Sequence, residues 1–287
     1  MKKKLRPVLV LVLLMGILTT GVLADTRPVV SIGQDLNMEQ RSQILAIFGA
    51  DSDVEIIETS NAEEVKYLGQ YVDRKILGSR AISSAYVKPL KPGSGIRVET
   101  YNISWVTEDM LISALATAGV KDAQVKVAAP FSVSGTAALT GVIKGFEGAT
   151  GEFIGEEEKQ VASEEIATTG ELAESLGSNE ASQIINKVKE EVLTKDLKSP
   201  AEIKKVVEVV SEEVNIELTE EQKEKVTELM EKISRLDINV EDIKGQLKNI
   251  SDSLKELNKK TEEVKGFVAK ILDFIEKIFN KIQDLFK

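Results

Sequence analysis

Residues 226–285 read VTELMEKISRLDINVEDIKGQLKNISDSLKELNKKTEEVKGFVAKILDFIEKIFNKIQDL. Apolar residues recur alternately three and four positions apart from Val226 to Leu285, and only Thr261 interrupts the eighteen positions of this series. A repeat of this spacing predicts amphipathic helices that bury a continuous seam, in a bundle or a coiled coil. Asp237-Ile238-Asn239 lowers the helix propensity, so we expect a turn or kink there.

The flanks of this seam change from polar to apolar towards its end. Segment 264–287 carries five lysines and three acidic residues, a net charge of +2. It is not expected to span a bilayer, because Lys270 and Asp273 would be stranded in hydrocarbon. We expect its broad face to contact the protein's own helices, a second copy or another protein, with peripheral membrane contact as the alternative. The residues of this partner or membrane face are Phe267, Ile271, Phe274, Ile278, Phe279 and Phe286.

The N-terminus has the pattern of a secretory signal peptide. Four basic residues within residues 2–6 precede an apolar run over 8–18, and Ala24 is a small residue suited to a cleavage site. The run is short for a membrane span, which needs about 20 residues, and an uncleaved anchor is the alternative. We therefore expect residues 1–24 to be removed and the mature protein to lie outside the cell or on its surface.

Charge and composition exclude several classes of function. The net charge is −10, and it becomes −14 without residues 1–24, which contain four basic and no acidic residues. Such an acidic chain is a poor ligand for nucleic acid, whose phosphates require Lys and Arg. The chain has no Cys and no His, so disulfides, thiolate or His metal sites and His-dependent triads are excluded. We predict no cofactor and no metal.

Short strands and capped helices alternate over residues 25–150, which predicts a small layered α/β domain. Strands are expected at 28–32, 53–58, 81–87, 96–106 and 124–128, with the turn at 91–95 joining the third to the fourth and Pro130 ending the fifth. Helices are expected after the caps Asn37, Ser60 and Thr107, the second of them running to Ile76. A small-residue helix should start at Ser132 or Ser134, and its Gly141 and Gly145 permit close approach to a neighbour.

The remainder of the chain is expected to be helical. Residues 151–177 are rich in Glu and predict an acidic linker with a weak helix. Residues 178–236 predict a helical domain, with a capping box at Thr219 and Gln222, and residues 237–287 a long amphipathic, coiled-coil-like helix. The fold class is thus α+β, with an N-terminal layered domain, a linker and a C-terminal all-helical region.

Two groups of residues are candidates for a ligand site. Ser132, Ser134, Gly135 and Thr136 follow a strand and open a helix, where backbone N–H groups can hold an anion; a helix cap with tight packing is the alternative. Trp105 and nearby tyrosines would suit a sugar platform, although aromatic residues on strands more commonly belong to a core. No catalytic residue can be assigned, and paired carboxylates carry little information in so acidic a chain.

Four stretches of the chain resemble a known family. They are Gly78–Ser84 (GSRAISS), Asn102–Thr107 (NISWVT), Thr117–Ala123 (TAGVKDA) and Ala129–Gly141 (APFSVSGTAALTG). They resemble the YpuA-like exported proteins of Gram-positive bacteria, the family of domain of unknown function 1002. The resemblance implies an extracytoplasmic location and supplies no substrate, cofactor or catalytic residue.

The sequence therefore favours an exported, non-enzymatic binding or structural component of the cell surface that acts through its helical seam. The alternative is an extracellular, carboxylate-dependent hydrolase of cell-wall material. A cleft that holds two carboxylates beside Trp105 would favour the hydrolase.

Overall fold

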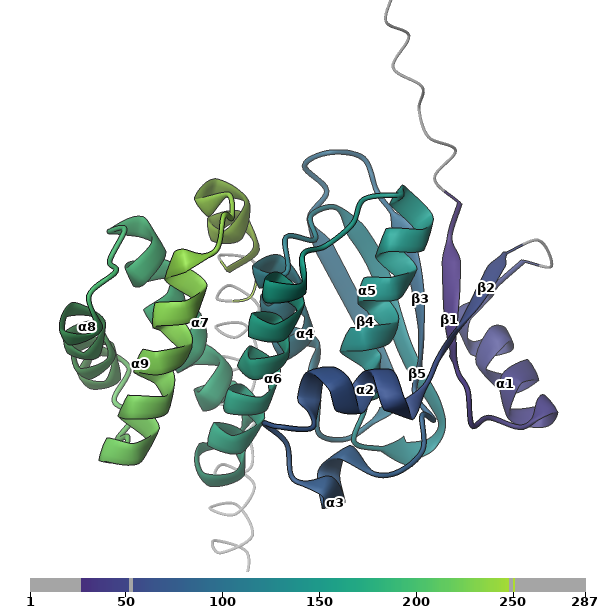
Figure 1. The fold of residues 1–287 in the computed structure, drawn as a ribbon, viewed down its shortest axis with the longest axis horizontal. Coiled ribbons are helices and arrows are strands. Elements are labelled where there is room, and N and C mark those ends of the chain that lie inside the picture. Colours follow the sequence, from purple (N-terminus) through teal and green to yellow (C-terminus); the bar gives the residue numbers. More distant parts are fainter. Residues whose placement is uncertain (1–26, 52–53, 248–249, 251–287) are drawn as a thin grey trace, which may run out of the picture.

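Five strands form a single sheet in the order β2-β1-β3-β5-β4 (Figure 1). The computed structural model describes residues 27–51, 54–247 and 250. β1 pairs with β2 and β4 with β5 in parallel, whereas β3 is antiparallel to both β1 and β5. The strands are β1 (Val29–Gly33), β2 (Glu55–Thr59), β3 (Ser84–Pro89), β4 (Ile96–Ile103) and β5 (Ala123–Val133).

Helices cover both faces of the sheet because its central strands are apolar on both sides. Val30 and Ile32 pack with α1 (Met38–Phe48), whereas the alternate residues Val29 and Ser31 face α5 (Ala137–Thr150). A Cβ built on Gly145 would lie 2.8 Å from Val87 Cγ2, so this glycine lets α5 lie close to β3, as the spacing of Gly141 and Gly145 predicts.

The pairing of strands brings four carboxyl ends to one edge of the sheet. β1 and β2 run in one direction with β4 and β5, and only β3 runs in the other. Consequently α1, α2 (Asn61–Leu68), α4 (Glu108–Thr117) and α5 all begin at this edge. The three predicted helix caps are confirmed, because the side chains of Asn37, Ser60 and Thr107 accept hydrogen bonds from backbone N–H groups in the first turns of their helices.

The turn at 91–95 joins β3 to β4 along the chain, as predicted, and β5 lies between these two strands in the sheet. Two other local predictions about this region are wrong. Pro130 does not end the fifth strand, since β5 continues to Val133, which pairs with Ile103 beyond a register shift. The helix capped by Ser60 ends at Leu68, and a separate short helix, α3 (Arg74–Leu77), follows it.

The acidic segment 151–177 is an integral part of the core, which corrects the predicted linker. Residues 156–176 form α6 (Glu156–Leu176), which packs against α2, α4, α7 and α9. Ile166 and Leu172 are buried in a hydrophobic cluster that extends from the sheet to α9. The high Glu content predicts a solvated segment, but two of the glutamates, Glu164 and Glu165, are themselves buried.

Residues 178–236 form helices, as predicted. These helices are α7 (Ser178–Thr194), α8 (Pro200–Glu213) and α9 (Glu220–Arg235), and α9 starts with the predicted capping box of Thr219 and Gln222. The helix breaks at residues 236–239, as expected, and resumes over 240–247. Among the described residues, no helix combines the length and apolar character that crossing a bilayer requires.

The first half of the seam is buried against the protein itself. Ile243, Leu247 and Ile250 belong to the main hydrophobic cluster, and Lys121 forms an ion pair with Asp242 at 3.1 Å. Gln246 Oε1 accepts a hydrogen bond of 3.1 Å from Ile96 N, which covers part of the exposed edge of β4. The predicted signal peptide and the apolar face of 264–287 lie outside the described residues.

Candidate functional site

A pocket of about 360 Å³ lies at the carboxyl-end edge of the sheet. In open α/β sheets, ligands bind outside the carboxyl ends of the strands. We call this the strand-end pocket. Its polar and aromatic lining consists of Glu64, Lys75, Ser79, Arg80, Ser83, Ser104, Trp105, Ser134 and Thr136.

The loop between α3 and β3 forms one wall of the strand-end pocket and is fixed by Asp35. Asp35 Oδ2 accepts a 2.7 Å hydrogen bond from Ala81 N, and its backbone oxygen accepts one of 2.9 Å from the Arg80 guanidinium. Ser84 Oγ also accepts a 3.0 Å hydrogen bond from Gly33 N. The two loops that follow β1 and precede β3 are thus held together.

The turn from β5 into α5 forms the opposite wall. Gly135 has φ 88° and a Cβ there would lie 2.3 Å from Ile103 Cγ2, so only glycine fits. The Ser134 oxygen accepts hydrogen bonds from Trp105 N and Val106 N at 3.2 and 3.0 Å. The structure therefore brings Ser134, Gly135 and Thr136 into the pocket, as a candidate site requires.

The prediction about how α5 begins is wrong. Ser132 lies exposed within β5 and does not line the pocket, and Ser134 does not cap the helix. Thr136 precedes α5, but its side chain makes no capping hydrogen bond to the helix. Its hydroxyl instead donates to Glu64.

Glu64 is the buried acid of the strand-end pocket, and no sequence pattern predicted it. Only 1% of the residue is exposed. Burial raises the pKa of its carboxyl to about 6, against the opposing effects of the hydrogen bonds from Thr136 and Asn61, and the charge of Asp35 raises it further. Nothing near Glu64 in the sequence marks it, because its partner Thr136 is 72 residues away.

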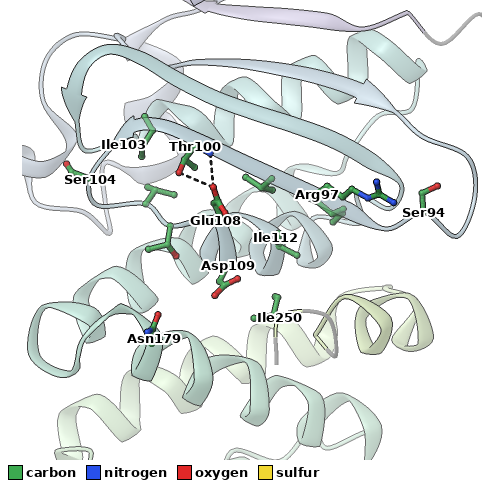
Figure 2. A pocket seen from close by; sticks show the side chains of 14 residues that line it. Ser94, Arg97, Thr100, Ile103, Ser104, Glu108, Asp109, Ile112, Asn179 and Ile250 are labelled. Carbon is green, nitrogen blue, oxygen red and sulfur yellow. Dashed lines mark hydrogen bonds between the residues drawn. The ribbon is translucent and has the colours of Figure 1, made fainter. Parts of the chain in front are cut away.

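A second hollow, the β4–α4 groove, has a volume of about 690 Å³. Figure 2 shows Glu108 turned towards β4, where its carboxylate accepts hydrogen bonds from Thr100 N and Oγ1 at 2.9 and 3.3 Å. Asp109 lies on the other side of the helix start, and burial, together with the charge of Glu108, raises its pKa to about 6. Asn179 and Ile250 close the far wall.

Three of the stretches on which the family resemblance of the sequence rests line the strand-end pocket. Residues 78–84, 102–107 and 129–141 all contribute to its lining. The family described as "Protein of unknown function (DUF1002)" matches residues 32–250. The chain belongs to the DUF1002 family. Over 199 residues it is 43% identical to "Uncharacterized protein YpuA" of Bacillus subtilis (strain 168), and the alignment covers 69% of each chain. No solved structure matches.

Neither hollow of this DUF1002 protein combines two carboxylates with Trp105. The β4–α4 groove contains Glu108 and Asp109 but is not lined by Trp105. The strand-end pocket is lined by Trp105 but by a single carboxyl group, that of Glu64. Trp105 packs against α6, where a Cβ on Gly170 would lie 2.1 Å from its Cζ2 atom. The aromatic ring is therefore partly a packing element.

A buried polar cluster joins α4, α6 and α7, and it too was missed. Lys189 Nζ lies 2.6 Å from Glu165 Oε1, 2.7 Å from Ser113 Oγ and 2.9 Å from Thr117 Oγ1. Burial lowers the pKa of Lys189, although the charge of Glu165 opposes this effect. A serine beside a lysine resembles a nucleophile with its base, but Ser113 is 3% exposed and Lys189 0%. Without access for a substrate, the cluster is structural.

The described residues offer no site for a metal ion of the usual kind. No group of three or more His, Cys, Asp or Glu side chains among them is arranged to hold one.

Proposed function

We propose that this DUF1002 protein is an exported, non-enzymatic binding or structural component of the bacterial cell surface, acting through its C-terminal segment. The observation that supports this is the anchoring of the seam. Ile243, Leu247 and Ile250 are only 2%, 2% and 1% exposed, because they are packed against other residues of the same chain. The 37 residues that follow Ile250 therefore start from a fixed point on the folded body.

The apolar residues of segment 264–287 need a covering surface. Burying each such side chain is worth roughly 1.5–3 kcal/mol, so a dozen of them in water would be a large free-energy cost. Because the seam up to Ile250 packs on the protein itself, we favour the protein's own body or a second copy as the surface that covers this face. Its charge of +2 also suits an otherwise acidic protein.

Export rests on the signal-peptide pattern of residues 1–24 and is tested first. N-terminal sequencing of the extracellular and surface fractions should give a chain that starts at Asp25. Recovery of the intact Met1 end in the membrane fraction would instead indicate an anchored protein.

The role of the C-terminal segment is tested by truncation after Glu263. Full-length mature protein and the truncated form are compared by light scattering and by co-sedimentation with anionic and zwitterionic vesicles. We expect neither form to sediment with vesicles. We also expect the double variant Phe274→Ser, Phe279→Ser to give the same light-scattering and sedimentation results as the truncated form. Asn280→Ser should give the results of the full-length parent. A full-length monomer that sediments with anionic vesicles, when the truncation does not, would replace self-contact by membrane contact.

The hydrolase remains the second candidate because Asp109, with its raised pKa, lies beside Glu108 in an open groove. An acid with a pKa near 6 can act as a general acid at moderate pH. Purified cell-wall material incubated with the mature protein should release no soluble sugar or peptide if the protein is non-enzymatic. Release that is lost in Asp109→Asn but kept in Asp242→Asn would overturn the non-enzymatic proposal.

A further inference from the structure

The strand-end pocket is lined by a buried serine whose hydroxyl has no partner among the residues that the structure describes. Ser83 is 3% exposed and lines the pocket. Its neighbour Ser84 accepts a hydrogen bond from Gly33 N, but the Ser83 hydroxyl makes no hydrogen bond to any residue that the structure describes. A buried polar group is normally satisfied by protein, water or ligand, so this hydroxyl is available to water or a ligand in the pocket.

The groups around Ser83 are predominantly hydrogen-bond donors. Arg80 and Lys75 line the pocket from the α3–β3 loop side. Arg80 uses its Nη2 atom to hold the Asp35 oxygen, which fixes the guanidinium in place while leaving its other N–H groups available. Lys75 bonds through its backbone N–H to Asp73, and its ammonium group has no partner within the described part of the chain.

The opposite wall adds backbone donors. Thr136 and Ala137 lie at the start of α5 and line the pocket. Their N–H groups make no hydrogen bond among the described residues, because the first helical turn has no acceptors for them. The positive end of the helix dipole favours an anion at this position.

We propose that the strand-end pocket binds the oxyanion group of a small ligand, a carboxylate or a phosphate, between Arg80, Ser83 and the start of α5. A volume of about 360 Å³ is at the lower end of the range for small-molecule sites, so the ligand is small. Arg80 supplies the charge-assisted hydrogen bonds, the Ser83 hydroxyl supplies a neutral one, and the α5 amides complete the set.

Glu64 sets the selectivity of this site. Glu64 lines the same pocket as Thr136, whose hydroxyl donates to the Glu64 carboxyl. A charged Glu64 repels an oxyanion at the start of α5, and a neutral amide at this position does not. Glu64→Gln is therefore expected to strengthen the binding of an anion, which a pocket for a cationic ligand would not show.

The test is a titration of the ¹⁵N-labelled mature protein with inorganic phosphate and, separately, with acetate, at constant ionic strength set by chloride. We expect saturable amide shifts at Ser83 and at Gly135–Ala137 with at least one of the two anions. The anion that saturates identifies the ligand chemistry as phosphate or carboxylate. This site is independent of the C-terminal segment, so either proposal can fail without the other.

Variants distinguish a built site from non-specific binding. Arg80→Gln should weaken binding about tenfold or more, as expected for loss of a charge-assisted hydrogen bond, and Ser83→Ala should weaken it a few-fold. Arg235→Gln is the matched control, because Arg235 is an exposed arginine paired with Glu231 on α9. Thermal unfolding without anion checks that Arg80→Gln is folded; if it is not, Ser83→Ala and Glu64→Gln decide.

Three results would overturn the proposal. One is the absence of saturable shifts at Ser83 and Gly135–Ala137 with both anions. Another is an equal loss of affinity in Arg80→Gln and Arg235→Gln, which indicates surface charge alone. The last is unchanged affinity in Ser83→Ala together with unchanged or weaker affinity in Glu64→Gln.

Discussion

At the scale of single residues, the buried ion pair between Lys189 and Glu165 ties three helices together. Both side chains are almost fully inaccessible, at 0% and 1%. Removal of one partner leaves the other charge buried, which costs about 3–5 kcal/mol. The hydroxyls of Ser113 and Thr117 lie within hydrogen-bond distance of both charges, but they are neutral and cannot compensate the charge of a missing partner.

We therefore expect Lys189→Met to lower the free energy of unfolding by about 3–5 kcal/mol, measured by urea denaturation. Lys189→Met combined with Glu165→Gln should lose less than the single variant, because no charge is then left unpaired. Lys187→Met is the matched control. Lys187 is on the same helix, and its ion pair with Glu213 is solvent-exposed, with 3.9 Å between Nζ and Oε2. A Lys189→Met protein as stable as the control would contradict a structural role for the pair.

Glu64 makes stability depend on pH. Its pKa rises from the ordinary 4.5 to about 6 in the folded protein, so between these values the folded chain binds the proton more tightly than the unfolded chain. Stability from this group therefore falls as the pH rises through that window. At pH 7.5 Glu64→Gln should be more stable than the parent by about 2 kcal/mol, and at pH 4 the difference should vanish.

Denaturant unfolding across this pH range measures the effect. Asp109 has a pKa raised to a similar value, so the pH profile of the parent protein contains both acids. The difference between the parent and Glu64→Gln isolates Glu64. A constant difference from pH 4 to 7.5 would contradict the raised pKa.

At the scale of elements, the sequence predicts helix starts well and strand neighbours poorly. A capping box is made by residues three positions apart, so Asn37, Ser60 and Thr219 could be recognised locally. The position of β5 between β3 and β4 depends on pairing across the chain, and no local signal reports it. For the same reason, the strand-end pocket could not be predicted from local sequence patterns, because its walls come from segments far apart in sequence.

α6 packs closely on the β4–α4 loop at Gly170 and Trp105. A methyl group at Gly170 would lie 2.1 Å from Trp105 Cζ2. Gly170→Ala must displace the ring, so we expect a loss of about 1–3 kcal/mol and a changed fluorescence of the single tryptophan. Gly245→Ala is the control, because nothing lies within 4 Å of its added methyl. In a helix that change is neutral or stabilising, by up to about 1 kcal/mol. Equal behaviour of the two variants would refute the contact.

At the scale of the whole molecule, the boundary that composition suggests near residue 150 has no counterpart in the packing. One hydrophobic cluster includes Val125 of the sheet, Ile166 of α6 and Leu229 of α9. The acidic composition of residues 151–177 reflects a helix whose outer face is charged, while the buried Glu165 pairs with Lys189 in the interior and the buried Glu164 pairs with the half-exposed Lys232. Composition reports average exposure, and it cannot distinguish a solvated acid from a buried, paired one.

The packing predicts how fragments behave. A fragment of residues 27–150 lacks α6 and α7, so it exposes the apolar face of α4 and leaves Ser113 and Thr117 without Glu165 and Lys189. We expect this fragment to unfold without a cooperative thermal transition, measured by circular dichroism. A fragment of residues 27–250 retains the whole cluster and should melt in one cooperative step. If residues 27–150 melt cooperatively near the temperature of the longer fragment, α6 and α7 are dispensable and the chain contains a separate N-terminal domain.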